Sequence, residues 1–117
     1  MAAFWVFLGG GTGAVLRWWL SGLAASPWGT MGVNILGSAM LAGLMHPEVG
    51  LQDPWKLALG TGLMGGFTTY STFNLDVWMA LQSGDTWRAG VTLLGTVFGC
   101  LLGAALGWAL AGSIVRP

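Results

Sequence analysis

The chain has 117 residues, of which 55% are hydrophobic and only 7% are charged, and its formal net charge is zero. So few charges cannot cover a soluble surface, and four basic residues are too few and too scattered to bind nucleic acid. The sequence has no His/Cys pair, no carboxylate pair on one helix face and no Walker-type loop, so we do not expect an enzyme. These features indicate a single all-α membrane domain over residues 1–117, with the lipid bilayer as its partner.

Four apolar segments predict four transmembrane helices, at residues 3–24, 28–45, 54–82 and 87–114. Each meets or approaches the roughly 20 residues needed to span about 30 Å of hydrocarbon. The first segment lacks a basic start and carries Arg17 well inside it, so we expect a permanent helix and not a removable signal peptide. Arg17 lies near the far end of this segment, where an arginine can snorkel to the lipid headgroups.

The second segment carries a polar face. Thr30, Asn34, Gly37 and Ser38 follow one another at intervals that place them on one side of a helix. A buried amide needs hydrogen-bond partners, so Asn34 either lines a pore or makes an interhelical hydrogen bond. A polar loop follows, in which we expect His46 to be solvated.

The third segment is longer than one untilted crossing needs, and its middle reads Gly-Gly-Phe-Thr-Thr-Tyr-Ser-Thr-Phe from Gly65 to Phe73. Paired glycines weaken a helix, and hydroxyl side chains compete for its backbone hydrogen bonds. We therefore predict a broken helix with the break near residues 65–69. In a membrane such a break lines a wet cavity or is buried in protein, and in transporters it commonly carries an ion site.

Asp76 follows Phe73 by three residues. An intramembrane carboxylate is a functional candidate, and the alternative is a structural pairing with Arg17 or with a backbone end.

The fourth segment carries a stripe of small residues at strict four-residue intervals: Gly95, Gly99, Gly103 and Gly107. Small residues let helix backbones approach closely, so the stripe predicts a packing face.

The basic residues give no orientation signal. With four spans, Lys56 and Arg116 fall on the side of the termini, while Arg17 and Arg88 fall on the opposite side. The chain could therefore insert in both directions, which suggests an antiparallel dual-topology homodimer.

The polar residues of the presumed path are hydroxyls, one amide, one arginine and aromatic rings, with hardly any carboxylates. Hydroxyl and amide hydrogens and the edges of aromatic rings all present positive charge, so this set favours an anion.

Three motifs carry a family resemblance: Gly-Gly-x-x-Gly-Ala-x-x-Arg from Gly9, Gly-Thr-x-x-Val-Asn from Gly29, and the run from Gly65 to Phe73. Over essentially its whole length the chain resembles the Fluc (CrcB) fluoride channels. The resemblance implies a passive, fluoride-selective channel that exports fluoride and lowers its cytoplasmic concentration. It also implies an antiparallel dual-topology homodimer with two pores, placed as a multi-pass protein in the bacterial plasma (inner) membrane.

The resemblance further implies roles for single residues. A structural sodium ion would lie at the dimer centre on the carbonyls of Gly65 and Thr68, since hard cations prefer oxygen ligands. Arg17 would stand near an entrance. The residues implied along the fluoride path are Tyr70, Phe73, Asn34, Thr30, Ser71 and Thr72. Two positions depart from the family pattern, because Tyr70 stands where phenylalanine is usual and Asp76 where glutamate is common.

Two other functions compete with the channel. A small proton-coupled multidrug exporter can share the dimeric four-helix plan, but it needs a titratable carboxylate in the drug pathway, typically in the first helix. The first segment has none, and Asp76 is the one intramembrane acid that could serve. A non-transporting assembly subunit would use the glycine stripes for packing alone, which leaves the hydroxyl-rich break unexplained.

Overall fold

The computed structural model describes residues 1–116, and all of its regular elements are helical. In chain order the elements are α1 (Ala2–Ser21), α2 (Trp28–Leu44), the 3₁₀ turn η1 (Pro47–Val49), the π-helix η2 (Lys56–Met64), α3 (Gly65–Phe67), α4 (Tyr70–Gln82) and α5 (Thr86–Val115). The all-α prediction is confirmed for these residues. α1, α2 and α5 begin and end within three residues of the predicted segments 3–24, 28–45 and 87–114.

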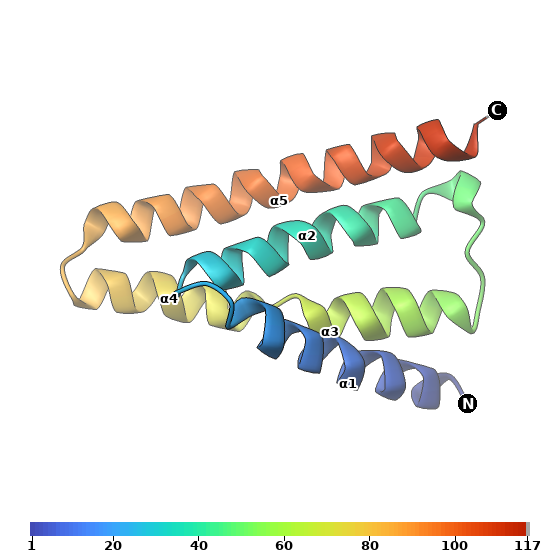
Figure 1. Ribbon diagram of the computed structural model, residues 1–117, viewed down its shortest axis with the longest axis horizontal. Coiled ribbons are helices and arrows are strands. Elements are labelled where there is room, and N and C mark those ends of the chain that lie inside the picture. Colours follow the sequence, from blue (N-terminus) through green and yellow to red (C-terminus); the bar gives the residue numbers. More distant parts are fainter. Residues whose placement is uncertain (117) are drawn as a thin grey trace.

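The helices are arranged as two packed pairs (Figure 1). α2 packs along α5, and α1 packs against η2 and α3. α4 continues the line of η2 and α3 and packs against α5. Both chain ends lie at one end of the molecule, and the connection between α4 and α5 lies at the other (Figure 1). The segment between α3 and α4 therefore lies midway along the molecule.

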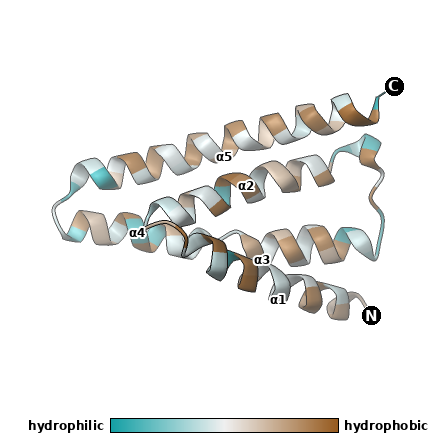
Figure 2. Ribbon diagram, in the orientation of Figure 1, coloured by the Kyte–Doolittle hydropathy of each residue, from teal (hydrophilic) through white to brown (hydrophobic). Residues whose placement is uncertain are grey.

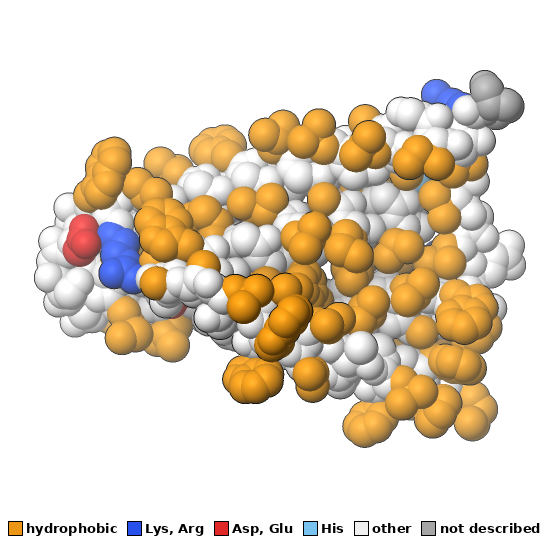
Figure 3. All heavy atoms as spheres, in the orientation of Figure 1, with side chains coloured by type: hydrophobic (Ala, Val, Ile, Leu, Met, Phe, Trp, Pro, Cys, Tyr) orange, Lys and Arg blue, Asp and Glu red, His pale blue; other side chains and the backbone are white. Residues whose placement is uncertain are grey.

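Apolar side chains cover the outside of the helices. Hydrophobic residues run along the helices, while hydrophilic ones gather near the connections (Figure 2). On the face drawn in Figure 3 the charged side chains lie near the ends of the molecule and apolar groups cover its length. Within the described residues, α5 is the one helix both long and apolar enough to cross a membrane by itself. This distribution of charge is the one a bilayer requires of a membrane protein.

The glycine stripe of α5 lies against α2. A Cβ added at Gly103 would lie 2.9 Å from the carbonyl oxygen of Ile35, and one added at Gly107 would collide with the carbonyl of Ala39. Gly95 and Gly99 face the side chains of Met31 and Ile35. Because van der Waals contact is a main source of helix association in lipid, this close approach holds the α2/α5 pair together.

α1 meets η2 in the same way. A Cβ at Gly9 would collide with the carbonyl of Ala58, and one at Gly13 would collide with the carbonyl of Leu63. The glycines of the first motif thus let two backbones touch, which fixes α1 directly beside the third segment.

The expectation that His46 is solvated was wrong. His46 is 6% exposed, and its ring packs on Trp108 with the ring centroids 4.6 Å apart. Its Nδ1 accepts a hydrogen bond from the backbone N–H of Glu48 at 3.2 Å and so caps η1. The sequence could not reveal this, because Trp108 is brought to the loop only when α5 packs beside α2.

We predict that Gly107→Ala destabilises the protein by about 1–3 kcal/mol, since the added methyl group would overpack the α2/α5 contact. The matched control is Gly90→Ala on the same helix, where an added Cβ meets nothing within 4 Å. Thermal unfolding in detergent should lower the Tm of the first variant and leave that of the second unchanged or raised. Equal melting temperatures would contradict the packing role of the stripe.

Candidate functional site

Helical conformation stops at Phe67 and resumes at Tyr70. Between them Thr68 (φ −89°, ψ 157°) and Thr69 (φ −148°, ψ 115°) are extended. The sequence placed the opening at residues 65–69, but Gly65 and Gly66 are helical. Gly66 serves close packing instead, because a Cβ there would collide with the carbonyl of Gly10. The interruption therefore falls on the two threonines.

Asn34 binds the interruption with both ends of its amide. Its Nδ2 donates to the carbonyl of Thr69 at 2.9 Å, and its Oδ1 accepts from the backbone N–H of Thr69 at 2.7 Å. Asn34 and Thr69 are both buried, with 7% and 8% exposure. One side chain of α2 thus supplies the two hydrogen bonds that the extended backbone of Thr69 would otherwise lack.

Thr69 also begins the next helix. Its side-chain oxygen accepts from the backbone N–H of Thr72 at 3.2 Å, which is the N-cap interaction of α4. The hydroxyls of Thr72 and Ser71 lie 3.1 Å and 3.4 Å from the same oxygen. Ser71 and Thr72, predicted to lie along an ion path, therefore surround the start of α4.

Arg17 reaches the interruption from α1. Its Nη1 donates to the carbonyl of Thr68 at 3.2 Å, and the Thr68 hydroxyl donates to the carbonyl of Met64 at 3.0 Å. Arg17 is thus held at mid-molecule by a backbone oxygen. The structural pairing of Asp76 with Arg17, which the sequence left open, is not formed, because Arg17 binds Thr68 and Asp76 binds Ser26.

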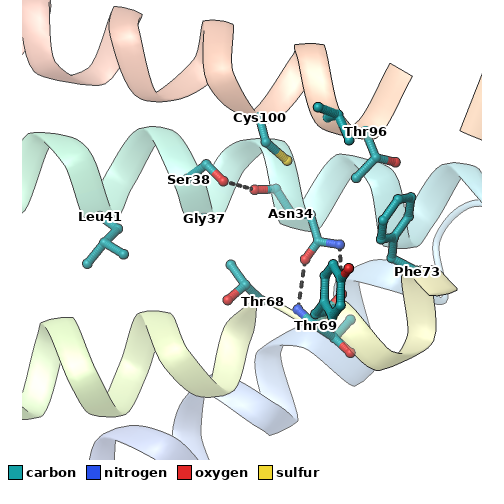
Figure 4. Close-up of a pocket in the computed structure, with 11 residues that line it drawn as sticks. Asn34, Gly37, Ser38, Leu41, Thr68, Thr69, Phe73, Thr96 and Cys100 are labelled. Atoms are coloured by element: carbon teal, nitrogen blue, oxygen red, sulfur yellow. Dashed lines mark hydrogen bonds between the residues drawn. The ribbon is translucent and has the colours of Figure 1, made fainter. Parts of the chain in front are cut away.

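A cavity of about 300 Å³ lies beside the interruption, between α2, α4 and α5 (Figure 4). Gly37 leaves room in the wall of this cavity for the side chain of Thr68, with which a Cβ at Gly37 would collide. The lining residues are Asn34, Gly37, Ser38, Leu41, Thr68, Thr69, Tyr70, Phe73, Thr96, Val97 and Cys100. None of them is charged.

Two aromatic rings on the first turn of α4 line this cavity. The centroids of Tyr70 and Phe73 are 5.9 Å apart, with the ring planes inclined by 54°. Phe73 is 5% exposed, whereas Tyr70 is 76% exposed. The two rings thus face different surroundings in the single chain.

The cavity brings together four of the predicted site residues, namely Asn34, Thr68, Tyr70 and Phe73. Thr30 is buried on α2 but does not line it. Asp76 lies elsewhere, where its Oδ1 accepts from the Ser26 hydroxyl at 2.8 Å and its Oδ2 is buried without a partner among the described residues.

Sequence reasoning did not place α5 at this site. Thr92 and Thr96 are 1% and 5% exposed, and neither hydroxyl has a hydrogen-bond partner within residues 1–116. Thr96 and Cys100, one helical turn apart, line the cavity together. One sequence signal could have indicated this placement: Thr92 and Thr96 lie four residues apart in a mostly apolar segment, next to the glycine stripe.

The carbonyls after Met64 are chemically suited to a hard cation. Thr69 donates its N–H to Asn34, so the carbonyl of Gly65 does not receive that helical hydrogen bond. Gly65 is exposed, and Gly65 and Thr68 both line a second cavity of about 600 Å³ between α2 and η2. These carbonyls lie at the C-terminal end of the helix formed by η2 and α3, which is the negative end of its dipole. The residues therefore fit a sodium ion, although Thr68 shares its oxygen with Arg17.

An uncharged cavity with amide and hydroxyl side chains in its lining, beside an interrupted helix and within a molecule of apolar exterior, is characteristic of membrane transport proteins. The family model described as CrcB-like protein, Camphor Resistance (CrcB), matches residues 4–108. The chain belongs to the CrcB family.

Curated relatives are similar along most of their length. A protein of Pectobacterium atrosepticum is 43% identical over 115 residues, covering 90% of this chain and 89% of its own. A protein of Cronobacter sakazakii is 43% identical over 118 residues, covering 93% of this chain and 92% of its own. A protein of Gloeobacter violaceus is 43% identical over 114 residues, covering 89% of this chain and 88% of its own. All three are named fluoride-specific ion channel FluC.

We predict that Asn34→Leu lowers the free energy of unfolding by about 2–5 kcal/mol, because the buried N–H and C=O of Thr69 both lose their partners. The measurement is thermal or denaturant unfolding in detergent. The matched control is Asn74→Leu, the same change at an exposed position on α4, which should alter stability by less than about 0.5 kcal/mol. Equal losses in the two variants would show that the Asn34 amide is not what holds the interruption.

Proposed function

We propose that this protein is a passive, fluoride-selective channel that lets fluoride leave the cytoplasm. The single observation that carries the proposal is the uncharged cavity at the Asn34–Thr69 contact, lined by Phe73 and Thr96. The relatives named as fluoride-specific channels support the choice of ion. We propose no catalytic step.

The cavity offers neutral donors to an anion. The Asn34 amide has two N–H groups, of which one binds Thr69, so the other remains available. The ring edges of Phe73 and Tyr70, which line the same cavity, present partial positive charge. A small anion would exchange its water for these donors. Without a fixed cation in the lining the anion is held weakly enough to leave again, which conduction requires.

Other predicted residues would act around this cavity. Thr30, Ser71 and Thr72 would extend the polar path along α2 and the start of α4, and Arg17 would add positive potential at the interruption. Outward flow needs no coupled energy source. A negative potential inside the cell favours the exit of an anion by about 2.3 kcal/mol per 100 mV.

We further propose that the working unit is an antiparallel dual-topology homodimer in the bacterial inner membrane, each chain crossing it several times. In that unit η2, α3 and α4 form one interrupted span. Tyr70 is 76% exposed beside the cavity, and Gly65 is exposed on the second one, so a second copy would cover both. Gly65 and Thr68 from two copies would together supply more oxygens for a structural sodium ion than one chain can. That ion would supply fixed positive charge and join the two copies.

We predict that Phe73→Ile abolishes fluoride efflux from proteoliposomes, because the ring edge beside the cavity is lost. Gel filtration should show the same assembly as for the unchanged protein. The matched control is Phe98→Ile on α5, where the side chain is 65% exposed, and its efflux should be unaffected. Efflux is followed with a fluoride electrode after valinomycin releases potassium. No efflux from the unchanged protein would reject the channel.

We predict that a C-terminal tag is found on both faces of the membrane in about equal amounts, because the basic residues give no orientation bias. Accessibility of the tag to a protease in intact cells and in inverted vesicles measures the ratio. Ser83→Lys adds a positive charge to the α4–α5 connection and should shift the tag toward the outside. A tag confined to one face in the unchanged chain would refute dual topology.

A further inference from the structure

Two residues line both the cavity of about 300 Å³ and the cavity of about 600 Å³, namely Leu41 of α2 and Thr68 of the interruption. The two cavities therefore meet at this pair. We propose that Leu41 and Thr68 form an apolar constriction through which an ion passes from the second cavity into the first, and that the size of the Leu41 side chain sets its width. This inference rests on the proposed function.

The second cavity leads from one end of the molecule to its middle. Asp53 and Lys56 line its outer part, at the end where both chain termini lie (Figure 1). Gly65 and Thr68 line its inner part, about three helical turns further along the chain. Thr61 adds a hydroxyl between the two parts. Charged side chains of a membrane protein lie where water reaches them, so the outer part of this cavity is open to solvent.

Thr68 is the fixed side of the constriction. Its hydroxyl donates to the carbonyl of Met64 at 3.0 Å, and its own carbonyl accepts from Arg17 at 3.2 Å. Its methyl group faces Gly37 on α2, where an added Cβ would collide with it. Thr68 therefore turns a methyl group, and not its hydroxyl, toward α2, and three contacts hold it there.

Leu41 is the side of the constriction that a substitution can resize. It lies one helical turn after Gly37 on α2, and it is 39% exposed, so close packing does not enclose it. In Figure 4 its side chain points away from α2, toward the side on which Thr68 lies. The two facing groups are both apolar. An apolar constriction controls ion flow because the ion has to shed water there.

Polar groups adjoin the constriction on the side of the first cavity and behind Thr68. The Arg17 guanidinium lies behind the carbonyl of Thr68, and the Asn34 amide lines the first cavity. An anion that loses water between Leu41 and Thr68 thus has a positive charge nearby and meets an amide next. The constriction would select by size, and the groups around it by sign of charge.

The experiment changes the size of Leu41 and measures anion efflux from proteoliposomes. Leu41→Ala widens the constriction, so fluoride efflux should rise roughly threefold or more and chloride efflux should become measurable. Leu41→Phe narrows it and should lower fluoride efflux roughly tenfold. The matched controls are Leu36→Ala and Leu36→Phe on the same helix, at a side chain that is 48% exposed and lines neither cavity. Both controls should keep the fluoride rate and the exclusion of chloride.

Unchanged efflux of both anions in the two Leu41 variants would overturn the proposal. So would equal changes in the Leu41 and Leu36 variants, because these would report a general disturbance of α2. Absent fluoride efflux from the unchanged protein would instead refute the channel itself, which keeps the two failures distinguishable.

A second measurement tests the route without relying on fluoride. Thr61→Cys in a Cys100→Ala background should react with 2-sulfonatoethyl methanethiosulfonate, a charged thiol reagent supplied on both faces of the liposome, because the second cavity holds water. The control is Leu8→Cys on α1, which is 45% exposed and lines neither cavity. It lies at a similar depth, since an added Cβ at Gly62 would be 3.0 Å from Gly9 Cα. Intact-mass spectrometry should find the adduct on the first variant only. No adduct at Thr61→Cys, or equal adducts at both positions, would overturn the route through the second cavity.

Discussion

The two hydrogen bonds between the Asn34 amide and the backbone of Thr69 are the interaction on which the rest of the site depends. An extended residue inside a membrane protein has a donor and an acceptor with no helical partner, and lipid cannot satisfy them. Asn34 satisfies both from a neighbouring helix. Thr69 is thereby free to cap α4, and Phe73 is set on the first turn of that helix beside the cavity.

The framework around this contact is fixed by glycine. On one side α1 touches η2 backbone to backbone at Gly9 and Gly13, and on the other α5 touches α2 at Gly103 and Gly107. Such contacts leave little room for relative movement, because a backbone cannot change rotamer as a side chain can. The α2/α5 pair forms two walls of the cavity, and the interruption with the start of α4 forms the third. The separation of its α2 and α5 walls is therefore set by main-chain packing, which suits discrimination by ion size.

The few charges are used outside the cavity. Arg17 donates to the carbonyl of Thr68, Arg88 donates to that of Ser26, and Arg116 pairs with Glu48 at 2.9 Å. The cavity itself is lined by amide, hydroxyl, thiol, aromatic and aliphatic groups, none of them charged. A permeating anion would thus meet dipoles and not a full counter-charge. Dipoles can replace water without trapping the ion, which links the low charge content of the chain to the proposed conduction.

The amino-acid sequence by itself determined the helical class and the positions of α1, α2 and α5 to within three residues, because hydropathy acts locally along the chain, and it predicted a break near residues 65–69. The tertiary structure decided what those residues do. It made Thr68 and Thr69, and not Gly65, the extended residues, since the amide that binds Thr69 comes from α2. It also brought Thr96 and Cys100 of α5 to the cavity, a placement that depends on how far apart two helix backbones pack and that no periodicity within one segment encodes.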